Sequence, residues 1–509
     1  MNEQAVRPRR APGPRGREAL RVAKLIRTDP RAAFEELTAR YGDVVRLDPP
    51  GSPPYFLVNG PDKAARVLVS EQDRYRKTPN ARLLARGLGE GLLANDGASW
   101  AGQRRAVQPL FARRHLGRFA AHMSEALAAA SRRWESRPDG ERIDMVEEMN
   151  VLTLDVAGRA LFGTDLTGDA EAVHRAIDDV LRAIGEAMSS VLPWWLPARL
   201  PGVSLDRAMR LQAWRWRRLD RASAALDAIV ERMVEQRSAA DPDPGDLLGL
   251  LLHGRDASGA PLMSRARVRD ELKTFLLVGH DTTATALAWT WYLLALNPAA
   301  RSRVEAEADE VLSGRRGRAG ERPVDPAADL PWAAAVVQES MRLFPPSWLI
   351  ERRCVRADRI GGFTVPVGAT VAVCTHLLHR DPRVWPDPGT FDPERFLPGR
   401  GADRERTAYI PFGAGRRQCV GLGFALLQAA LTVGMLSRRF AFDLAPGTQV
   451  EAEATLTLRP RGRLPMVLRR RTDRSSASGA VRAASPGTDP GETGPPETEP
   501  PEAEAPRTE

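Results

Sequence analysis

One cysteine stands in a setting that favours a thiolate bound to a metal. Residues 411–431 read PFGAGRRQCVGLGFALLQAAL, a glycine-rich loop that is expected to carry Cys419 into the first turn of a helix. The partial positive charge of a helix N-terminus and the neighbouring Arg416 and Arg417 would stabilise the thiolate. A thiolate is a soft ligand that suits iron. A lone cysteine is more often a small buried hydrophobic residue, but this loop favours the metal ligand.

The other residues of this loop also have a use around a bound group. Gly413, Gly415 and Gly421 would let the backbone approach something flat or bulky, and free N–H groups there could hydrogen-bond the sulfur. Phe412 would supply an apolar cover. The loop therefore predicts a site for a large planar ligand.

A second candidate site lies in the middle of an apolar helix. Residues 267–296 read RVRDELKTFLLVGHDTTATALAWTWYLLAL, and the sequence GHDTT at 279–283 interrupts the apolar pattern. A buried acid beside a hydroxyl costs stability unless it is used. We interpret Asp281 and Thr282 as a proton relay at a helix distortion. The alternative is a polar patch that faces another helix.

Two pairs of side chains have spacings that place each pair on one helical face. Glu339 and Arg342 lie three residues apart, and Trp100 and Arg104 lie four apart. The first pair can form an ion pair, and the second can offer an indole N–H and a guanidinium to a carboxylate. Either pair alone would be an ordinary surface feature.

The elements that must position these residues are mainly helices. Two short β patterns, Asp43–Leu47 and Tyr55–Val58, flank a proline-rich turn, and helical patterns then run from residue 100 to residue 343. Strands and turns return at residues 359–375, followed by an irregular proline-rich stretch and one last helix. This order predicts a mostly α fold of the α+β class.

Composition separates one large domain from two polar ends. Residues 1–18 are rich in Arg, Pro and Gly, while residues 471–509 hold seven prolines, eight acids and no aromatic residue. Neither end can build a core, so we expect disorder in both and one domain over residues 19–470. The tail carries a net charge of −4, which leaves +13 on the rest of the chain. We interpret it as a solubilising segment.

The formal charge of +9 does not by itself indicate nucleic-acid binding. Only four of the 74 basic residues are lysines, and the arginines occur on nearly every segment instead of one stripe. No apolar stretch is long enough to predict a transmembrane span, and the N-terminus lacks the apolar stretch of a secretory signal. Three cysteines without a CxxC pair predict neither a disulfide framework nor a zinc site. A cytoplasmic protein is expected.

The cysteine loop resembles the haem-binding loop of the cytochrome P-450 family. Phe412, Gly415, Arg417, Cys419 and Gly421 match that loop position for position. Further segments resemble the family in its own order: the acid–alcohol step, the Glu-x-x-Arg helix and a downstream Pro-Glu-Arg-Phe. The resemblance covers about residues 20–470. It implies a mostly α prism with a long central helix and small β-sheets.

The resemblance also assigns roles. Cys419 would be the axial ligand of haem b (iron-protoporphyrin IX), while Asp281 and Thr282 would supply protons for oxygen activation. Arg395 would complete a structural network with Glu339 and Arg342.

Four residues would hold the haem propionates by the same resemblance. Trp100, Arg104 and Arg417 match family positions directly. The fourth anchor is Arg352 or Arg353. The spacing to Gly361 favours Arg352, the spacing to Asp358 favours Arg353, and we choose Arg352.

The distal pocket is expected to be apolar. By resemblance it is covered by residues 78–95, which are glycine-rich and expected to be mobile, and by residues 189–202, which could equally pack on their own domain. Val278 stands where the family usually has Ala or Gly and should crowd the pocket. Ser347–Ile350 should line it, and His280 should neighbour the site without acting as a ligand.

These features predict a monooxygenase that inserts one oxygen atom of O2 into a hydrophobic small molecule. No charged residue is clearly placed to fix a carboxylate, which favours a terpenoid or other neutral secondary metabolite over a fatty acid. No segment resembles an appended flavin or iron–sulfur domain, so a ferredoxin or flavodoxin-type protein with an NAD(P)H-dependent reductase should supply electrons. Two alternatives stay open: a relative that couples phenols or uses peroxide, and a haem-based sensor or carrier.

Overall fold

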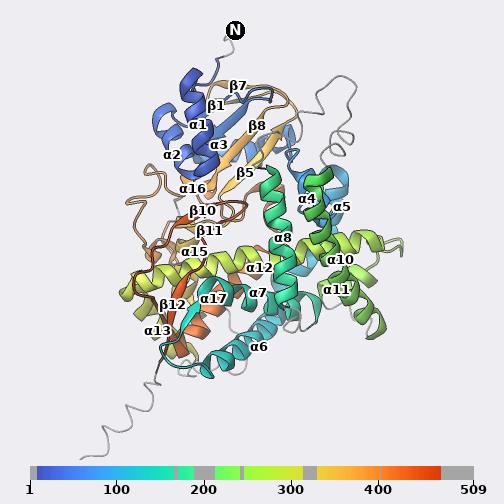
Figure 1. The fold of residues 1–509 in the computed structure, drawn as a ribbon, viewed down its shortest axis with the longest axis vertical. Helices are drawn as coiled ribbons and strands as arrows, with labels where there is room; N and C mark the ends of the chain where they lie inside the picture. The colour runs from blue at the N-terminus through green and yellow to red at the C-terminus, as the bar shows by residue number, and fades with distance from the viewer. Residues whose placement is uncertain are drawn as a thin grey trace, which may run out of the picture. The chain divides into compact units, whose positions relative to one another are not determined.

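Helices dominate the part of the chain that the computed structural model describes, which comprises residues 9–164, 170–188, 213–240, 246–312, 329–401 and 403–471. The strands are short and form several small sheets (Figure 1). The expected mostly α fold with small β-sheets is therefore confirmed. The helices are α1 (Gly16–Thr28), α2 (Pro30–Tyr41), α3 (Pro61–Ala65), α4 (Ala81–Leu88), α5 (Gly97–Val107), α6 (Leu116–Glu135), α7 (Met145–Phe162), α8 (Ala170–Met188), α10 (Ala213–Ala240), α11 (Leu247–His253), α12 (Arg265–Leu296), α13 (Pro298–Leu312), α15 (Pro331–Leu343), α16 (Thr375–Leu378) and α17 (Leu422–Arg439).

The largest sheet has five strands in the order β1-β2-β8-β5-β3. The expected early strands appear in it as β1 and β2, paired antiparallel with Val44 opposite Val58. β2 and β8 run parallel, and β8 and β5 run antiparallel, so segments far apart in the sequence share this sheet. The strands are β1 (Val44–Leu47), β2 (Tyr55–Val58), β3 (Tyr75–Arg76), β4 (Arg142–Asp144), β5 (Leu349–Cys354), β6 (Asp358–Ile360), β7 (Phe363–Val365), β8 (Thr370–Cys374), β9 (Phe440–Leu444), β10 (Ala452–Ala454), β11 (Leu458–Pro460) and β12 (Pro465–Arg470).

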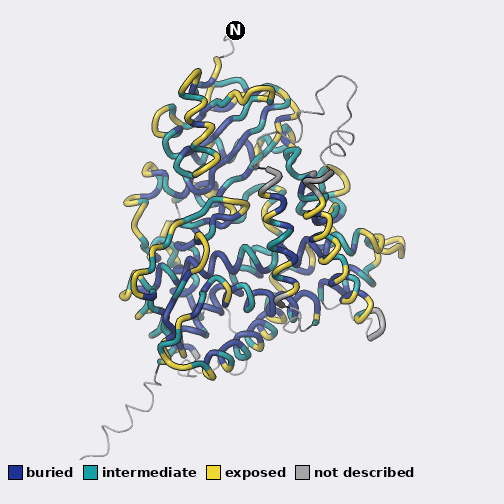
Figure 2. Tube along the Cα trace, in the orientation of Figure 1, coloured by how far each residue is buried: buried dark blue, intermediate teal, exposed yellow. Residues whose placement is uncertain are grey.

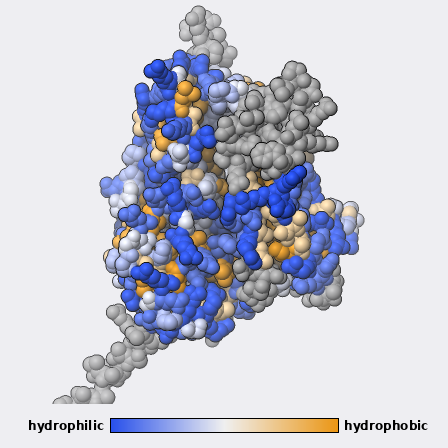
Figure 3. Space-filling view, viewed as in Figure 1, coloured by the Kyte–Doolittle hydropathy of each residue, from blue (hydrophilic) through white to orange (hydrophobic). Residues whose placement is uncertain are grey.

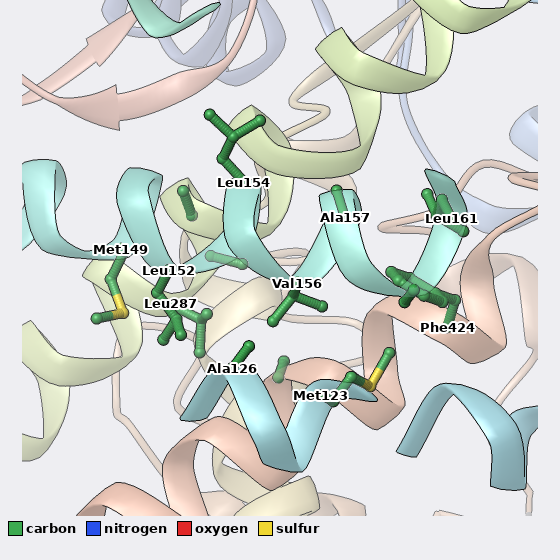
Figure 4. Close-up of a cluster of buried hydrophobic side chains, with 14 of the residues drawn as sticks. Met123, Ala126, Met149, Leu152, Leu154, Val156, Ala157, Leu161, Leu287 and Phe424 are labelled. Carbon is green, nitrogen blue, oxygen red and sulfur yellow. The ribbon is translucent and has the colours of Figure 1, made fainter. Parts of the chain in front are cut away.

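The main apolar core lies where α6, α7, α12 and α17 pack together. Met149, Leu152 and Val156 recur along one side of α7, where Leu152 lies beside Leu287 of α12. Phe424 of α17 lies near Leu161, toward the other end of α7 (Figure 4). The burial of α12 follows from its sequence, because apolar residues occur nearly all round it. The tube in Figure 2 is dark along this helix and along the central strands of the large sheet. The long helix that carries the acid–alcohol step is thus held rigidly from several sides.

The expectation of disorder at the N-terminus needs correction for residues 9–18. Arg9 pairs with Phe363, and Ala11 is buried in the apolar cluster around β2 and β8. Arg46 N–H donates to the carbonyl of Pro12 (2.7 Å), and a Cβ on Gly13 would clash with the Arg46 carbonyl. A proline-rich segment is extended in any case, so it can lie along a sheet edge at little entropic cost. Residues 1–8 and 472–509 lie outside the described residues.

The surface of the described part is mainly polar. On the face drawn in Figure 3, hydrophilic residues predominate and hydrophobic ones are scattered between them. Of the helices that the structure describes, none has the length and apolar character needed to cross a membrane.

Candidate active site

The cysteine loop is a tight turn that ends before α17. Cys419 N–H donates to the carbonyl of Phe412 (2.9 Å), and Gln418 N–H donates to that of Gly415 (3.1 Å). Gly421 is the N-cap of α17, so Cys419 precedes the helix and does not enter its first turn as the sequence predicts. These two turn hydrogen bonds fold the loop back on itself and delay the start of the helix.

Only some of the loop glycines are required by the backbone. Gly415 has a φ of +71°, and a Cβ there would clash with the carbonyl of Leu68. At Gly421 the φ is −88°, and a Cβ would meet Phe111 at an ordinary distance of 3.9 Å. Phe412 packs against the main apolar core, in line with the cover expected of it.

Cys419 differs from the two buried cysteines in being exposed. Its side chain is accessible to solvent, yet burial within the surrounding protein raises the pKa of the thiol above its ordinary value. A backbone hydrogen bond at Gly421 and the charge of Arg104 lower that pKa in turn. Binding to a metal ion would remove the proton outright, because a coordinating thiol is deprotonated.

The two arginines of the loop pair with carboxylates that the sequence did not predict. Arg416 forms an ion pair with Asp73, and Arg417 forms one with Asp96. Each guanidinium group is thus engaged by a carboxylate from another segment. Arg104 is the cation that acts on the thiol.

Arg104 also contacts the loop directly. Its Nη1 donates to the carbonyl of Gln418 (2.7 Å), and its Nε donates to Gln108 (3.2 Å). Its role at a propionate stays a prediction.

A cavity of about 220 Å³ lies beside the cysteine loop. It brings together Trp100, Arg352 and Arg417, three of the four residues expected at the propionates, and the Arg417 guanidinium lies 4.5 Å from the centre of the Trp100 ring. Arg353 is exposed at the surface of β5, so Arg352 is the arginine that meets the others. The full lining is Leu68, Gln72, Asp73, Arg76, Gly97, Ala98, Trp100, Ala101, Arg352, Arg416 and Arg417.

Cations outnumber anions around this cavity. Burial, followed by the charge of Arg417, lowers the pKa of Lys77 to about 7 and that of Arg352 to about 10. Asp96 is the carboxylate that faces them, and it accepts from Lys77 N–H (2.8 Å) and from Arg417. The Nη1 of Arg417 is buried without a hydrogen-bond partner. Such a cluster suits a ligand with negative charge.

These residues fit haem. A haem group whose iron met the Cys419 sulfur would carry two propionates, and the unpartnered Arg417 Nη1 with Arg352 and Trp100 offers donors for them. Sequence reasoning missed Lys77 and Asp96, which belong to no motif. The one available signal was the rarity of lysine in this chain, where only four occur.

The acid–alcohol step lies in an uninterrupted helix. α12 continues through Gly279 as one helix from Arg265 to Leu296, and the expected local distortion stays a prediction. The Thr282 hydroxyl donates to the carbonyl of Val278 (3.0 Å), which satisfies it inside the helix. A Cβ on Gly279 would only touch Ala157 and Leu161 of α7 at 3.7 Å, so this glycine leaves the helix undisturbed.

Asp281 is a carboxyl group that tends to hold its proton. Burial raises the pKa of Asp281, and the charges of His280 and Arg459 oppose this effect. Burial also lowers the pKa of His280, whose Nδ1 lies 2.9 Å from the carbonyl of Leu276. His280 meets His174 edge to face at 6.2 Å between ring centres. It is therefore a neighbour of Asp281, as expected.

The Glu-x-x-Arg pair is fully buried and forms the expected network. Arg342 donates to both carboxylate oxygens of Glu339 (2.7 and 2.8 Å), and Arg395 Nε lies 3.6 Å from Glu339. Arg342 also donates to the carbonyls of His379, Pro388 and Thr390. Those carbonyls belong to the irregular stretch that precedes the cysteine loop, so the network fixes that stretch to α15.

Trp348 and Ile350, both expected to line the distal pocket, lie in different surroundings. Trp348 is buried against Phe34 and donates to the Thr455 carbonyl (2.9 Å), so it belongs to the core and not to a pocket lining. Its neighbour Ile350 lies beside the cysteine loop, 3.8 Å from the position of a Cβ on Gly413. Residues 189–202 lie outside the described residues.

A mostly helical fold that sets a cysteine loop beside a cationic cavity is the arrangement of a haem-thiolate protein. The sequence matches the family described as Cytochrome P450 over residues 12–464. It is 38% identical over 427 residues to cytochrome P450 132 of Mycobacterium tuberculosis, covering 82% of this chain and 88% of that one. The chain belongs to the cytochrome P450 family.

Two relatives come from Streptomyces melanosporofaciens. Cyclooctatin synthase is 34% identical over 420 residues, which cover 82% of this chain and 87% of the relative. Cyclooctat-9-en-7-ol 5-monooxygenase is 34% identical over 414 residues, which cover 80% and 84%. Members of the family bind haem b through a cysteine thiolate, and this chain is an oxidoreductase of the monooxygenase class.

Proposed function

We propose that this P450 hydroxylates or epoxidises a neutral hydrophobic molecule of the terpenoid class, with Cys419 as the haem ligand and Asp281 and Thr282 as the proton relay. The observation that carries the haem assignment is the buried, unpartnered Nη1 of Arg417, which lies with Arg352 and Trp100 in the cavity beside the Cys419 loop. The names of the two Streptomyces relatives support the terpenoid class. Val278 in place of a smaller residue would narrow the approach to the site.

Haem, when bound, supplies the oxygen-activating chemistry, and the thiolate sulfur favours O–O cleavage. The protein residues hold and move protons around it. Asp281 has a raised pKa and therefore carries a proton at higher pH than an exposed aspartate does. The Thr282 hydroxyl donates its hydrogen bond to the Val278 carbonyl, so its oxygen can still accept a hydrogen bond from a water molecule. That water would be held where a proton is needed.

The reaction class is tested with isotopic oxygen. A compound screen for displacement of the iron-bound water, read as a shift in the haem absorption band, identifies a substrate. Turnover under ¹⁸O2 should then give a product that contains one labelled oxygen atom. A product without label would instead favour oxidative coupling. A product that takes up label only from added ¹⁸O-labelled peroxide would favour a peroxygenase.

An acidic ferredoxin is the electron donor that the protein surface favours. From residue 97 to residue 124 the chain has no Asp or Glu, and Arg105, Arg113 and Arg114 of this stretch are exposed. Arg104 ties the stretch to the cysteine loop through the Gln418 carbonyl. Electrons can therefore enter close to Cys419 from a partner of opposite charge.

Electron transfer from such a ferredoxin should slow as salt rises, because screening weakens the attraction. Between about 50 and 500 mM salt we expect the second-order reduction rate to fall by roughly tenfold or more. Arg113→Glu with Arg114→Glu should lower the rate at low salt, whereas Arg27→Glu on α1 should not. Rates that stay flat with salt, measured by stopped-flow reduction of the haem, would argue against this partner.

A further inference from the structure

The segment between α4 and α5 lies directly on the first turns of α12. Gly89 has a φ of +75°, and a Cβ there would clash with the Asp270 carboxylate. A Cβ on Gly91 would clash with the Thr274 hydroxyl and with the Asp270 carbonyl. Both glycines are therefore required by the close approach. The expected mobility of this region conflicts with the contacts that residues 89–95 make.

The backbone N–H and the backbone carbonyl of Leu92 are both bound by charged side chains. Leu92 N–H donates to Glu271 Oε2 (3.0 Å), while Lys77 Nζ donates to the carbonyls of Leu92 (2.9 Å) and Leu93 (2.5 Å). Glu90 N–H adds a hydrogen bond to Asp270 (2.9 Å). Two side chains from different parts of the chain thus fix one short stretch of backbone.

Glu271 is an unusual residue to find in this place. Its side chain is fully buried, its second carboxylate oxygen has no hydrogen-bond partner, and burial raises its pKa to about 7. The charged groups that face it are Lys77 from the segment after β3 and Asp270 and Arg267 from α12 itself. Neither haem binding nor the proton relay uses this carboxyl group.

The clamped backbone lies at one end of the helix face that carries the relay. Val278 and Thr282 follow Glu271 by seven and eleven residues, which at 100° per residue places all three within about 20° of one line along α12. Leu92 and Leu93 are half-buried and pack against the same apolar core as Val278. The clamp therefore fixes the backbone of these two leucines at the Glu271 end of this face.

We propose that Glu271 and Lys77 are positioning residues that fix Leu92 and Leu93 at the end of the distal pocket and so limit the size of the ligands that reach the iron. This inference rests on the proposed function, because it takes the Val278–Thr282 face of α12 as the pocket wall. It assigns a specificity role to a buried carboxyl group and an ammonium group that lie outside the family motifs.

The test compares Glu271→Leu, which removes the hydrogen-bond acceptor, with Glu271→Gln, which keeps it. Exchange of the amide hydrogens in residues 89–95, followed by mass spectrometry on the haem-loaded protein, should become about tenfold faster in the leucine variant. The glutamine variant should stay within about threefold of the wild type, since its side-chain oxygen still accepts from Leu92. Glu231→Leu is the matched control, because Glu231 pairs with Arg269 of α12 (2.7 Å) away from the clamp.

The second readout is size selectivity. Imidazole and clotrimazole bind to the iron with a spectral shift, and the affinity of the bulky azole relative to imidazole should rise at least about fivefold in Glu271→Leu and return in Glu271→Gln. If Glu271→Leu does not fold, Gly91→Ala lifts the same backbone from α12 and should give the same two changes. Unchanged exchange, or faster exchange with an unchanged affinity ratio, would overturn the proposal. The wild-type haem spectrum tests the proposed function separately, before any variant is made.

Discussion

Replacement of Cys419 by serine is expected to abolish the red-shifted absorption of the reduced, carbon-monoxide-bound protein that is peculiar to thiolate-ligated haem. Serine keeps the size of the side chain but offers iron no soft anionic sulfur. Within the described part of the chain, the substitution removes the single exposed cysteine, so no other accessible thiol can take its place. A difference spectrum of the reduced protein with carbon monoxide measures the effect.

The other two cysteines are matched controls. Cys354 and Cys374 are buried, and burial raises the pKa of each, to about 12 for Cys374. They lie in β5 and β8 and behave as small core residues. Cys354→Ser and Cys374→Ser should therefore keep the thiolate spectrum. If either of them erased the band while Cys419→Ser kept it, the ligand assignment would be wrong.

Removal of either partner of the buried ion pair should prevent accumulation of haem-loaded protein. Arg342→Ala leaves the Glu339 carboxylate buried and strands three backbone carbonyls, at a cost of about 3–5 kcal/mol. That is a large fraction of the stability of an ordinary protein. The measurement is the ratio of haem absorbance to protein absorbance after purification, together with the melting temperature.

An exposed ion pair provides the contrast. Arg461 and Glu451 lie 2.5 Å apart with more than half of each side chain exposed, so Arg461→Ala should cost less than about 1 kcal/mol. Glu339→Ala should match Arg342→Ala, because each strands the other partner. Full haem content in both buried-pair variants would show that the network does not hold the irregular stretch.

The sequence alone was most reliable where chemistry sits in a short, local motif. The cysteine loop, the Glu-x-x-Arg pair and the apolar run of α12 each depend on residues close together in the chain. Arg395 could be predicted as the third member of the network only because the segment around it resembles a family motif, which links it to the distant Glu-x-x-Arg helix. Local pattern and resemblance therefore predicted the fold class and three of the residues that line the cavity beside the cysteine loop, Trp100, Arg352 and Arg417.

The errors arose where a choice between distant partners decided the outcome. Arg416 and Arg417 pair with Asp73 and Asp96, which no spacing in the sequence connects to them.

Lys77 and Glu271 were missed for a related reason. Each is an ordinary residue in the sequence, and its contact with Leu92 forms only because residues 89–95 pack on α12. A sequence pattern marks residues that repeat at a helical or strand period, and neither residue does. Contacts of this kind come from tertiary packing.

The central claim is that Asp281 and Thr282 deliver protons during oxygen activation over a thiolate-bound haem. Thr282 is half-buried and bonded to Val278, whereas Thr283 is buried and points about 100° away around the helix. The two adjacent threonines therefore form a matched pair. We expect only the first to hold a water molecule toward the site.

The most direct measurement is the amount of product and of hydrogen peroxide formed per reducing equivalent, with a substrate found by the spectral screen. Thr282→Ala should bind haem and substrate normally and still consume reducing equivalents, but its yield of product should fall by about tenfold or more while hydrogen peroxide rises. Thr283→Ala should stay within about twofold of the wild type. A fully coupled Thr282→Ala beside an uncoupled Thr283→Ala would contradict the account, and so would coupling that neither substitution changes.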